Sequence, residues 1–236
     1  MIDRAQLSRE LAVFGLAADE IALARLDEYA ARLVETNQKF NLTAVTEPSA
    51  IVTRHFADSA TLLTAVTPPQ GASLLDVGSG AGFPGLVVAI LRPDLAVTLL
   101  DATGKKVAFL AETAAALGLT VTTLHARAEE AAVLPQYRER FDFATARAVA
   151  ELRLLGEYAL GFVKVGGALV AMKGRLTSEE TQAAAHCLTV MGAKEEARRV
   201  LTLADGSERT LLTLRKVSQT PTGYPRPSAK MAKKPL

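Results

Sequence analysis

The first seventy residues carry apolar side chains at helical spacing. Leu7, Leu11 and Phe14 are separated by four and three residues, which is the spacing of one face of a helix. The pattern resumes further along, pauses at the polar stretch NLTAVTEPSA, and returns near residue 47. We therefore predict helices between residues 3 and 40 and a further helix from residue 47, with Pro48 in its first turn.

From residue 72 onward, short apolar runs alternate with segments of helical spacing. The predicted strands are residues 72–77, 96–101, 119–126, 141–147 and 166–174. The predicted helices are residues 83–92, 104–118, 151–163 and 177–192. Because parallel strands need crossover helices, we expect an α/β fold with a doubly wound sheet and a ligand crevice at the carboxyl ends of its strands.

The end of the chain departs from this alternation. Residues 197–216 predict two strands that turn at Asp205-Gly206 and form an antiparallel edge of the sheet. The last stretch, residues 218–236, is rich in proline and should be irregular, either draped over the domain or ordered by a partner. We therefore divide the chain into an N-terminal helical region (1–67), an α/β domain (68–217) and a basic tail (218–236).

Composition narrows the class of protein. At 236 residues, with 49% hydrophobic and 22% charged residues, the chain can bury one substantial core. The single cysteine, Cys187, excludes an internal disulfide framework and favours a reducing, cytoplasmic location. The histidines and acids lack metal-ligand spacing, so no metal is expected. No stretch approaches the ~20 apolar residues of a membrane span, and we expect a soluble monomer.

Charge is distributed unevenly. Six of the 27 basic residues and none of the 25 acidic residues lie between Arg215 and Leu236, so the rest of the chain carries 21 against 25, a net charge of −4. A basic terminal segment suits a polyanion such as a nucleic acid, or it serves as a solvated, solubilising tail.

The stretch LLDVGSGAGFPG, residues 74–85, is the strongest candidate for a ligand site. Its second half fits the dinucleotide pattern, with Asp101 lying 19 residues beyond Gly82. However, Gly78 comes directly after the predicted strand and two residues after Asp76. This gives the acidic-x-Gly-x-Gly-x-Gly form associated with methyltransferases that use S-adenosylmethionine (SAM). A plain strand-to-helix turn would explain neither aspartate. We therefore favour SAM over a nicotinamide or flavin cofactor.

Several further motifs accompany the glycine stretch in a fixed order. They are NLTAV at 41–45, RHFADS at 54–59, LLDATGKKVAFL, ARAEE, ARAVA, MKG and a terminal YPR followed by KKPL. From Asn41 to Leu236 this combination resembles the bacterial ribosomal RNA small-subunit methyltransferase G family. The resemblance implies a class I SAM-dependent methyltransferase fold: a Rossmann-like, mostly parallel sheet ending in an antiparallel hairpin, with an N-terminal helical cover. It also implies transfer of a methyl group from SAM to guanine-N7 in the decoding-region loop of 16S ribosomal RNA, with that RNA or the 30S subunit as substrate.

The resemblance implies a set of cofactor contacts at the ends of the predicted strands. The predicted cofactor-binding residues are Gly78, Gly80, Phe83, Asp101, Ala102, Thr103, Ala128, Glu129 and Arg147. Asp101 would accept from both ribose hydroxyls, Ala128 and Glu129 would meet the adenine edge, and Phe83 would pack against the ligand. Beside Glu130, Glu129 could instead be part of a solvated face.

The residue types also bear on the methylated atom. The fourth strand ends in ATARAVA, without the Asn or Asp, two prolines and aromatic residue that align an exocyclic amine. Methylation of a pyrimidine carbon usually needs a cysteine nucleophile, and Cys187 lies on a predicted helix far from the strand ends. Guanine-N7 has an in-plane lone pair and loses no proton, so alignment and proximity suffice.

The site must still hold a guanine and its phosphates. The predicted catalytic residues are His55, Arg147 and Lys173, and the predicted RNA-binding residues are Arg54, Lys173, Arg226, Lys233 and Lys234. Each has a structural alternative: Arg147 could pair with Asp142, Glu151 or Asp58, His55 could be a buried histidine, and Lys173 could belong to a turn. The tail also departs from the family pattern, with Ala229 and Met231 where glycine and proline would stand.

Other functions stay open at this level. A nicotinamide-dependent oxidoreductase would rest on the glycine stretch alone. A non-catalytic RNA-binding protein that holds SAM would explain the basic tail equally well. A small-molecule methyltransferase would leave the tail without a role.

Overall fold

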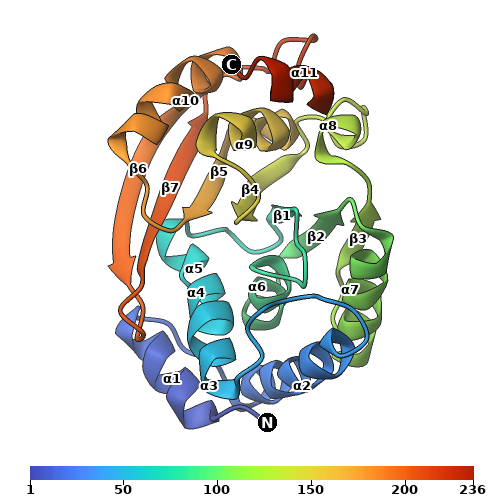
Figure 1. Cartoon of the computed structure of the whole chain (residues 1–236), viewed down its shortest axis with the longest axis vertical. Coiled ribbons are helices and arrows are strands. Elements are labelled where there is room, and N and C mark those ends of the chain that lie inside the picture. The colour runs from blue at the N-terminus through green and yellow to red at the C-terminus, as the bar shows by residue number, and fades with distance from the viewer.

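A computed structural model describes residues 1–236 and shows a seven-stranded sheet between two layers of helices (Figure 1). The strands are β1 Ser73–Val77, β2 Ala96–Asp101, β3 Thr122–His125, β4 Phe141–Arg147, β5 Val163–Lys173, β6 Ala193–Thr202 and β7 Glu208–Lys216. Their order across the sheet is β3-β2-β1-β4-β5-β7-β6. The strands β1 to β5 are parallel, and β7 pairs antiparallel with both β5 and β6. The predicted doubly wound sheet with an antiparallel edge is therefore confirmed.

One face of the sheet is covered by the N-terminal half of the chain. These helices are α1 Arg4–Val13, α2 Glu20–Asn37, α3 Pro48–Ile51, the π-helical η1 Val52–Ala57, α4 Asp58–Ala60, α5 Leu62–Ala65, α6 Gly85–Leu91 and α7 Gly104–Ala116. They share one buried cluster with alternate side chains of the sheet. The helix predicted from residue 47 is thus interrupted by a π-helical segment, a feature that often marks functional sites.

The other face is covered by elements that follow β3 and by the end of the chain. These are α8 Ala128–Ala131, α9 Leu152–Ala159, the short 3-10 helix η2 Leu160–Phe162, α10 Ser178–Val190 and α11 Ser228–Lys233. A second buried cluster joins α8, α9 and α10 to the sheet. None of the helices combines the length and the apolar character that crossing a membrane requires.

Local signals in the sequence explain where several elements begin and end. The side chains of Asp3, Asp19 and Thr177 accept hydrogen bonds from the first-turn amides of α1, α2 and α10. Gly118, at a φ of +63°, follows the end of α7. The predicted turn at Asp205-Gly206 joins β6 to β7, with the Asp205 carboxylate accepting from the Ser207 amide.

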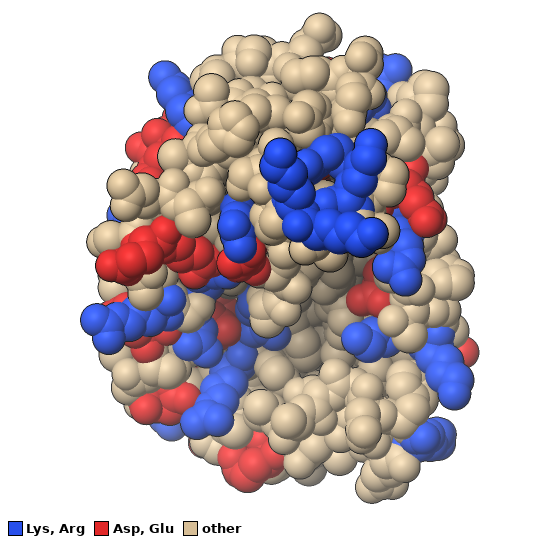
Figure 2. Space-filling model, turned by 45° about the horizontal axis from the view of Figure 1, so that its top comes forward, with Lys and Arg blue, Asp and Glu red and all other residues tan.

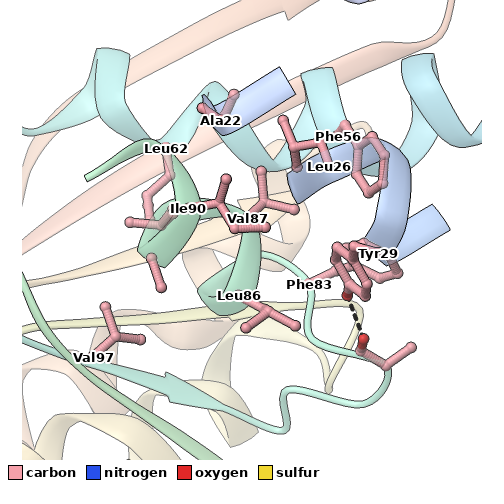
Figure 3. Close-up of a cluster of buried hydrophobic side chains, with 14 of the residues drawn as sticks. Ala22, Leu26, Tyr29, Phe56, Leu62, Phe83, Leu86, Val87, Ile90 and Val97 are labelled. Carbon is pink, nitrogen blue, oxygen red and sulfur yellow. Dashed lines mark hydrogen bonds between the residues drawn. The ribbon is translucent and has the colours of Figure 1, made fainter. Parts of the chain in front are cut away.

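The N-terminal helices are anchored directly on the glycine stretch (Figure 3). Tyr29 of α2 is fully buried, its ring stacks on Phe83 at a centroid distance of 5.4 Å, and its hydroxyl donates to the Ala81 carbonyl. A Cβ atom on Gly82 would lie 2.6 Å from the Tyr29 hydroxyl oxygen. Gly82 is therefore required by the docking of α2, independently of any ligand.

The tail is more ordered than its composition indicates. The expectation of an irregular segment is wrong for residues 228–233, which form α11 with Met231 fully buried. Before α11, the Arg138 guanidinium donates to three carbonyl groups of residues 220–224. These contacts hold the tail against the surface of the domain, as one of the two predicted arrangements requires. The division of the chain at residues 67 and 217 stays a prediction.

Candidate active site

Two cavities open at the carboxyl ends of the strands. One lies at the ends of β1 and β2, and the other lies at the ends of β4 and β5. Strands β1 and β4 are neighbours in the sheet, although β2 and β3 lie between them in the chain. This is the point at which the strand order reverses, where open α/β sheets bind their ligands. The site predicted from periodicity therefore coincides with cavities in the structure.

The smaller cavity, of about 240 Å³, is termed the cofactor cavity. Its lining residues are Val77, Gly78, Leu100, Asp101, Ala102, Ala126, Arg127, Ala128, Glu129, Val149 and Tyr158. Apolar side chains from β1 and β2 form its floor, while Asp101 and Glu129 supply carboxylates. A pocket of this chemistry suits the adenosine part of SAM, whose flat base needs apolar walls and whose ribose needs acceptors.

Asp101 is held in place by the backbone around it. Its Oδ2 accepts from the Gly80 amide at 2.9 Å, and its Oδ1 accepts from the Thr103 amide at 2.8 Å. Because each carboxylate oxygen has a second lone-pair site, both can still accept from a hydroxyl. Gly80 and Thr103 thus orient the carboxylate, and neither is a wall of the cavity.

Asp76, at the end of β1, binds the backbone of the glycine stretch. It is fully buried, and its Oδ2 accepts from the Gly85 amide at 2.8 Å, while its Oδ1 has no partner. Burial raises the pKa of Asp76 to about 6, despite the lowering effect of the Gly85 amide. A Cβ atom on Gly85 would overlap the Leu99 side chain and lie 2.7 Å from the Asp76 Cβ atom, so Leu99 and Asp76 together require a glycine here.

The structure separates the predicted cofactor residues into groups. Gly78, Asp101, Ala102, Ala128 and Glu129 line the cofactor cavity. The other four predicted residues do not line this cavity. The amides of Gly80 and Thr103 donate to the Asp101 carboxylate, whereas Phe83 and Arg147 make no such bond. Their direct contact with the cofactor stays a prediction.

The larger cavity, of about 470 Å³, is termed the basic cavity. Its lining residues are Val45, Arg54, His55, Asp58, Arg147, Ala148, Met172, Lys173, Gly174 and Arg209. It gathers side chains from the π-helical segment, β4, β5 and β7. All three predicted catalytic residues and the predicted RNA-binding residue Arg54 lie here.

A buried carboxylate binds two of the arginines. Asp58 is 2% exposed, and its Oδ2 accepts from the Arg147 Nη1 at 2.9 Å while its Oδ1 accepts from the Arg209 Nε at 3.1 Å. Of the three partners considered for Arg147, Asp58 is therefore the actual one. Sequence reasoning missed Arg209, since it lies 151 residues from Asp58 and no local motif marks it.

His55 is a buried, neutral histidine. Its ring stacks on Phe83 at a centroid distance of 4.2 Å, and its Nε2 lies 2.8 Å from the Thr43 hydroxyl. Burial, and then the nearby Arg147 charge, lower the pKa of His55 to about 4. The Arg147 guanidinium also lies over the Phe83 ring, 5.0 Å from its centroid. His55 and Phe83 thus form a wall that positions Arg147.

The remaining cations of the basic cavity each have one carboxylate partner. Lys173 Nζ bonds to the Glu180 carboxylate and the Ala150 carbonyl, both at 2.8 Å. Arg54 Nε donates to Asp205 at 2.7 Å, which joins the β6–β7 turn to the π-helical segment.

A strained residue separates the two cavities. Ala148 lines the basic cavity and its neighbour Val149 lines the cofactor cavity. The φ of Ala148 is +57°, a left-handed conformation that costs a residue with a Cβ atom about 1–2 kcal/mol. Such a turn directly after β4 allows adjacent residues to face different cavities.

The tail residues predicted to bind RNA divide into two kinds. Arg226 forms a bidentate ion pair with the fully buried Glu157 of α9, at 2.7 and 2.8 Å. Lys233 and Lys234 are exposed and form no ion pair. On the face drawn in Figure 2, Lys and Arg side chains border a central hollow, and Asp and Glu gather mainly to its left. Such a face suits a polyanion.

Comparison with known proteins places these features in a family. The family model for GidB, rRNA small subunit methyltransferase G, matches residues 22–211. A protein of Desulfitobacterium hafniense named ribosomal RNA small subunit methyltransferase G is 43% identical, with 98% of this chain and 95% of the relative covered. A relative of the same name from an Exiguobacterium species is 40% identical over the whole of both chains.

Solved structures share the fold at low identity. A SAM-dependent methyltransferase from Aquifex aeolicus has a TM-score of 0.52 and 20% identity, with 77% of this chain and 97% of that chain covered. TrmN from Thermus thermophilus has a TM-score of 0.53 and 23% identity, with 70% and 53% covered. The sheet and its two layers are thus those of class I methyltransferases, and by sequence this chain belongs to the rRNA small subunit methyltransferase G family.

Proposed function

We propose that this protein transfers the methyl group of SAM to N7 of a guanine in the decoding-region loop of 16S ribosomal RNA. SAM would occupy the cofactor cavity, and the guanine would enter from the basic cavity. The observation that carries the proposal is the arrangement of these two cavities on either side of the segment that follows β4, with Ala148 in one and Val149 in the other. Family membership supports an rRNA substrate.

The cofactor cavity supplies binding and orientation. When bound, SAM provides an electrophilic methyl group on its sulfonium. Asp101 would accept from the two ribose hydroxyls, because its backbone partners leave one acceptor site on each oxygen. The Tyr158 ring and the Leu100 side chain provide walls for the base.

The basic cavity contains no free general base. Both oxygens of Asp58 accept from arginines, and the ring nitrogens of His55 face Thr43, the Arg54 carbonyl and Arg147. Cys187, a candidate nucleophile for pyrimidine methylation, is buried on α10, where burial raises the pKa of its thiol to about 12. An acceptor nitrogen that loses no proton, such as guanine-N7, fits this chemistry.

Transfer of labelled methyl from SAM to 30S subunits and to 16S RNA lacking the modification tests the proposal. Asp101→Asn and Arg147→Gln would each reduce incorporation at least tenfold, while Asp94→Asn, in an ion pair with Arg92 outside both cavities, would not. The label should be recovered as 7-methylguanosine. Binding of S-adenosylhomocysteine to Arg147→Gln then tests the predicted cofactor contact of Arg147: weaker binding would support that contact, and unchanged binding would confine its role to the basic cavity.

The test also separates the alternatives. Tight S-adenosylhomocysteine binding without transfer to either RNA would favour a non-catalytic RNA-binding protein. Preference between 30S subunits and free 16S RNA identifies which of the two is the substrate. The nicotinamide-dependent oxidoreductase finds no support in the family or in the fold neighbours. The exposed large apolar residues are distributed over many elements, which supports a monomer, and light scattering would check this.

A further inference from the structure

The two arginines bound to Asp58 differ in what their guanidinium groups can still reach. Arg147 Nη1 also donates to the Arg54 carbonyl, and its Nη2 lies 3.4 Å from the His55 Nδ1. Arg209 donates through Nε to the Asp58 carboxylate and through Nη1 to the backbone carbonyl of Glu208, and its Nη2 makes no hydrogen bond within the protein. The Arg209 side chain is 21% exposed, against 14% for Arg147. Arg209 therefore has the more available donor.

The basic cavity has more cationic side chains than carboxylates to pair with them. Arg54 and Lys173 each have their own carboxylate, Asp205 and Glu180. Arg147 and Arg209 share the single carboxylate of Asp58. Among the residues that line the cavity and their ion-pair partners, four cations thus face three carboxylates, in partly buried surroundings where charge is screened less than on the open surface. An anion bound here would complete the balance.

Resting on the function proposed above, we infer that Arg209 binds an RNA phosphate next to the target guanine and that Asp58 is the positioning residue that holds it. A guanidinium suits a phosphate because it keeps its charge and its N–H groups form charge-assisted hydrogen bonds with phosphate oxygens. With Nε bound to Asp58 and Nη1 bound to the Glu208 carbonyl, Nη2 is the nitrogen left for the phosphate. The apolar side chains of Val45 and Met172 line the same cavity and offer surface for a base beside that phosphate.

Salt dependence is the measurement that identifies a phosphate contact. Each phosphate neutralised by the protein contributes about 0.7 to 1 to the slope of log affinity against log salt. Arg209→Gln removes the charge, Arg209→Lys keeps it, and Arg215→Gln is the matched control. Arg215 lies on the same strand, pairs with Glu196 and does not line the cavity. Binding to unmodified 30S subunits and 16S RNA is measured between about 50 and 200 mM salt.

We expect Arg209→Gln to weaken RNA binding roughly tenfold and to lower the salt slope by about one. Arg209→Lys should keep the wild-type slope, and Arg215→Gln should resemble wild type. Affinity for S-adenosylhomocysteine should stay within about twofold in all three, because Arg209 does not line the cofactor cavity.

Two results would overturn the inference. If Arg209→Gln lowers the melting temperature but leaves the salt slope unchanged, Arg209 serves only to neutralise Asp58. If neither quantity changes, the residue has no role in RNA binding. Wild-type protein that binds no RNA, or shows no methyl transfer, would instead refute the proposed function itself, so the two failures are distinguishable.

Discussion

The ion pair between Arg226 and Glu157 decides whether the basic tail is primarily part of the fold or an RNA contact. Glu157 is fully buried on α9, and Arg226 binds it through Nε, Nη2 and its backbone amide. The Arg226 Nη1 also donates to the Lys234 carbonyl at 3.0 Å. Arg226→Met would therefore leave a buried carboxylate with only the backbone amide of residue 226.

The expected loss of stability follows from these contacts. Removing one partner of a buried ion pair costs about 3–5 kcal/mol, chiefly because the other charge stays buried. Since one backbone donor to Glu157 remains, we expect the lower end, about 3 kcal/mol. For a chain of this length each kcal/mol lowers the melting temperature by about 2–4 °C, so Arg226→Met should melt about 6–12 °C below wild type.

A double variant and a surface control make the assay specific. Glu157→Gln combined with Arg226→Met removes both charges and keeps an acceptor for the backbone amide, so it should recover more than half of the loss. Lys234→Met, at an exposed position, should leave the melting temperature unchanged. If Arg226→Met weakens RNA binding and lowers the salt slope without changing the melting temperature, Arg226 is an RNA contact and its ion pair with Glu157 does not stabilise the fold.

Two further predictions concern the buried side chains behind the cavities. Tyr29→Phe removes the donor to the Ala81 carbonyl and should cost about 1–3 kcal/mol of unfolding free energy, with weaker binding of S-adenosylhomocysteine by calorimetry; unchanged values for both would contradict it. The pKa of His55 falls from 6.5 to about 4 on folding, so its contribution of about 3 kcal/mol is complete above pH 6.5 and is lost as the pH falls towards 4. Urea unfolding between pH 4 and 7 should show a weaker pH dependence in His55→Gln than in wild type, and equal slopes would contradict the assignment.

The parts of the fold that follow from local sequence were predictable. Strand β2 and helix α10 depend on residues within a few positions of one another, and both occur where the pattern predicts them. The π-helical segment was not predictable. Its hydrogen bonds span one residue more than those of an α-helix, but this difference produces no distinct spacing of apolar residues in the sequence. The segment carries Arg54 and His55, which both line the basic cavity.

The pairing of charges lay beyond the sequence. Composition shows that the tail is basic, but not that Arg226 finds a carboxylate 69 residues away on α9. In the same way the motif RHFADS contains Asp58, yet Arg209 lies on a strand that becomes its neighbour only after the sheet has formed. Lys216, whose ammonium is buried against Glu139, is a third such case. Long-range ion pairs depend on topology, which a local pattern does not contain.

The glycine stretch shows why a motif alone is weak evidence for a ligand. Two of its glycines are explained by the protein itself, because Tyr29 approaches Gly82 and Asp76 lies beneath Gly85. Gly80, at a φ of +60°, has no such neighbour, and its amide instead orients the Asp101 carboxylate. The same loop thus contacts the N-terminal helices on one side and orients the Asp101 carboxylate on the other. A change in the helix α2 contact should therefore reach the cofactor cavity through the loop, without any direct contact between Tyr29 and the cofactor.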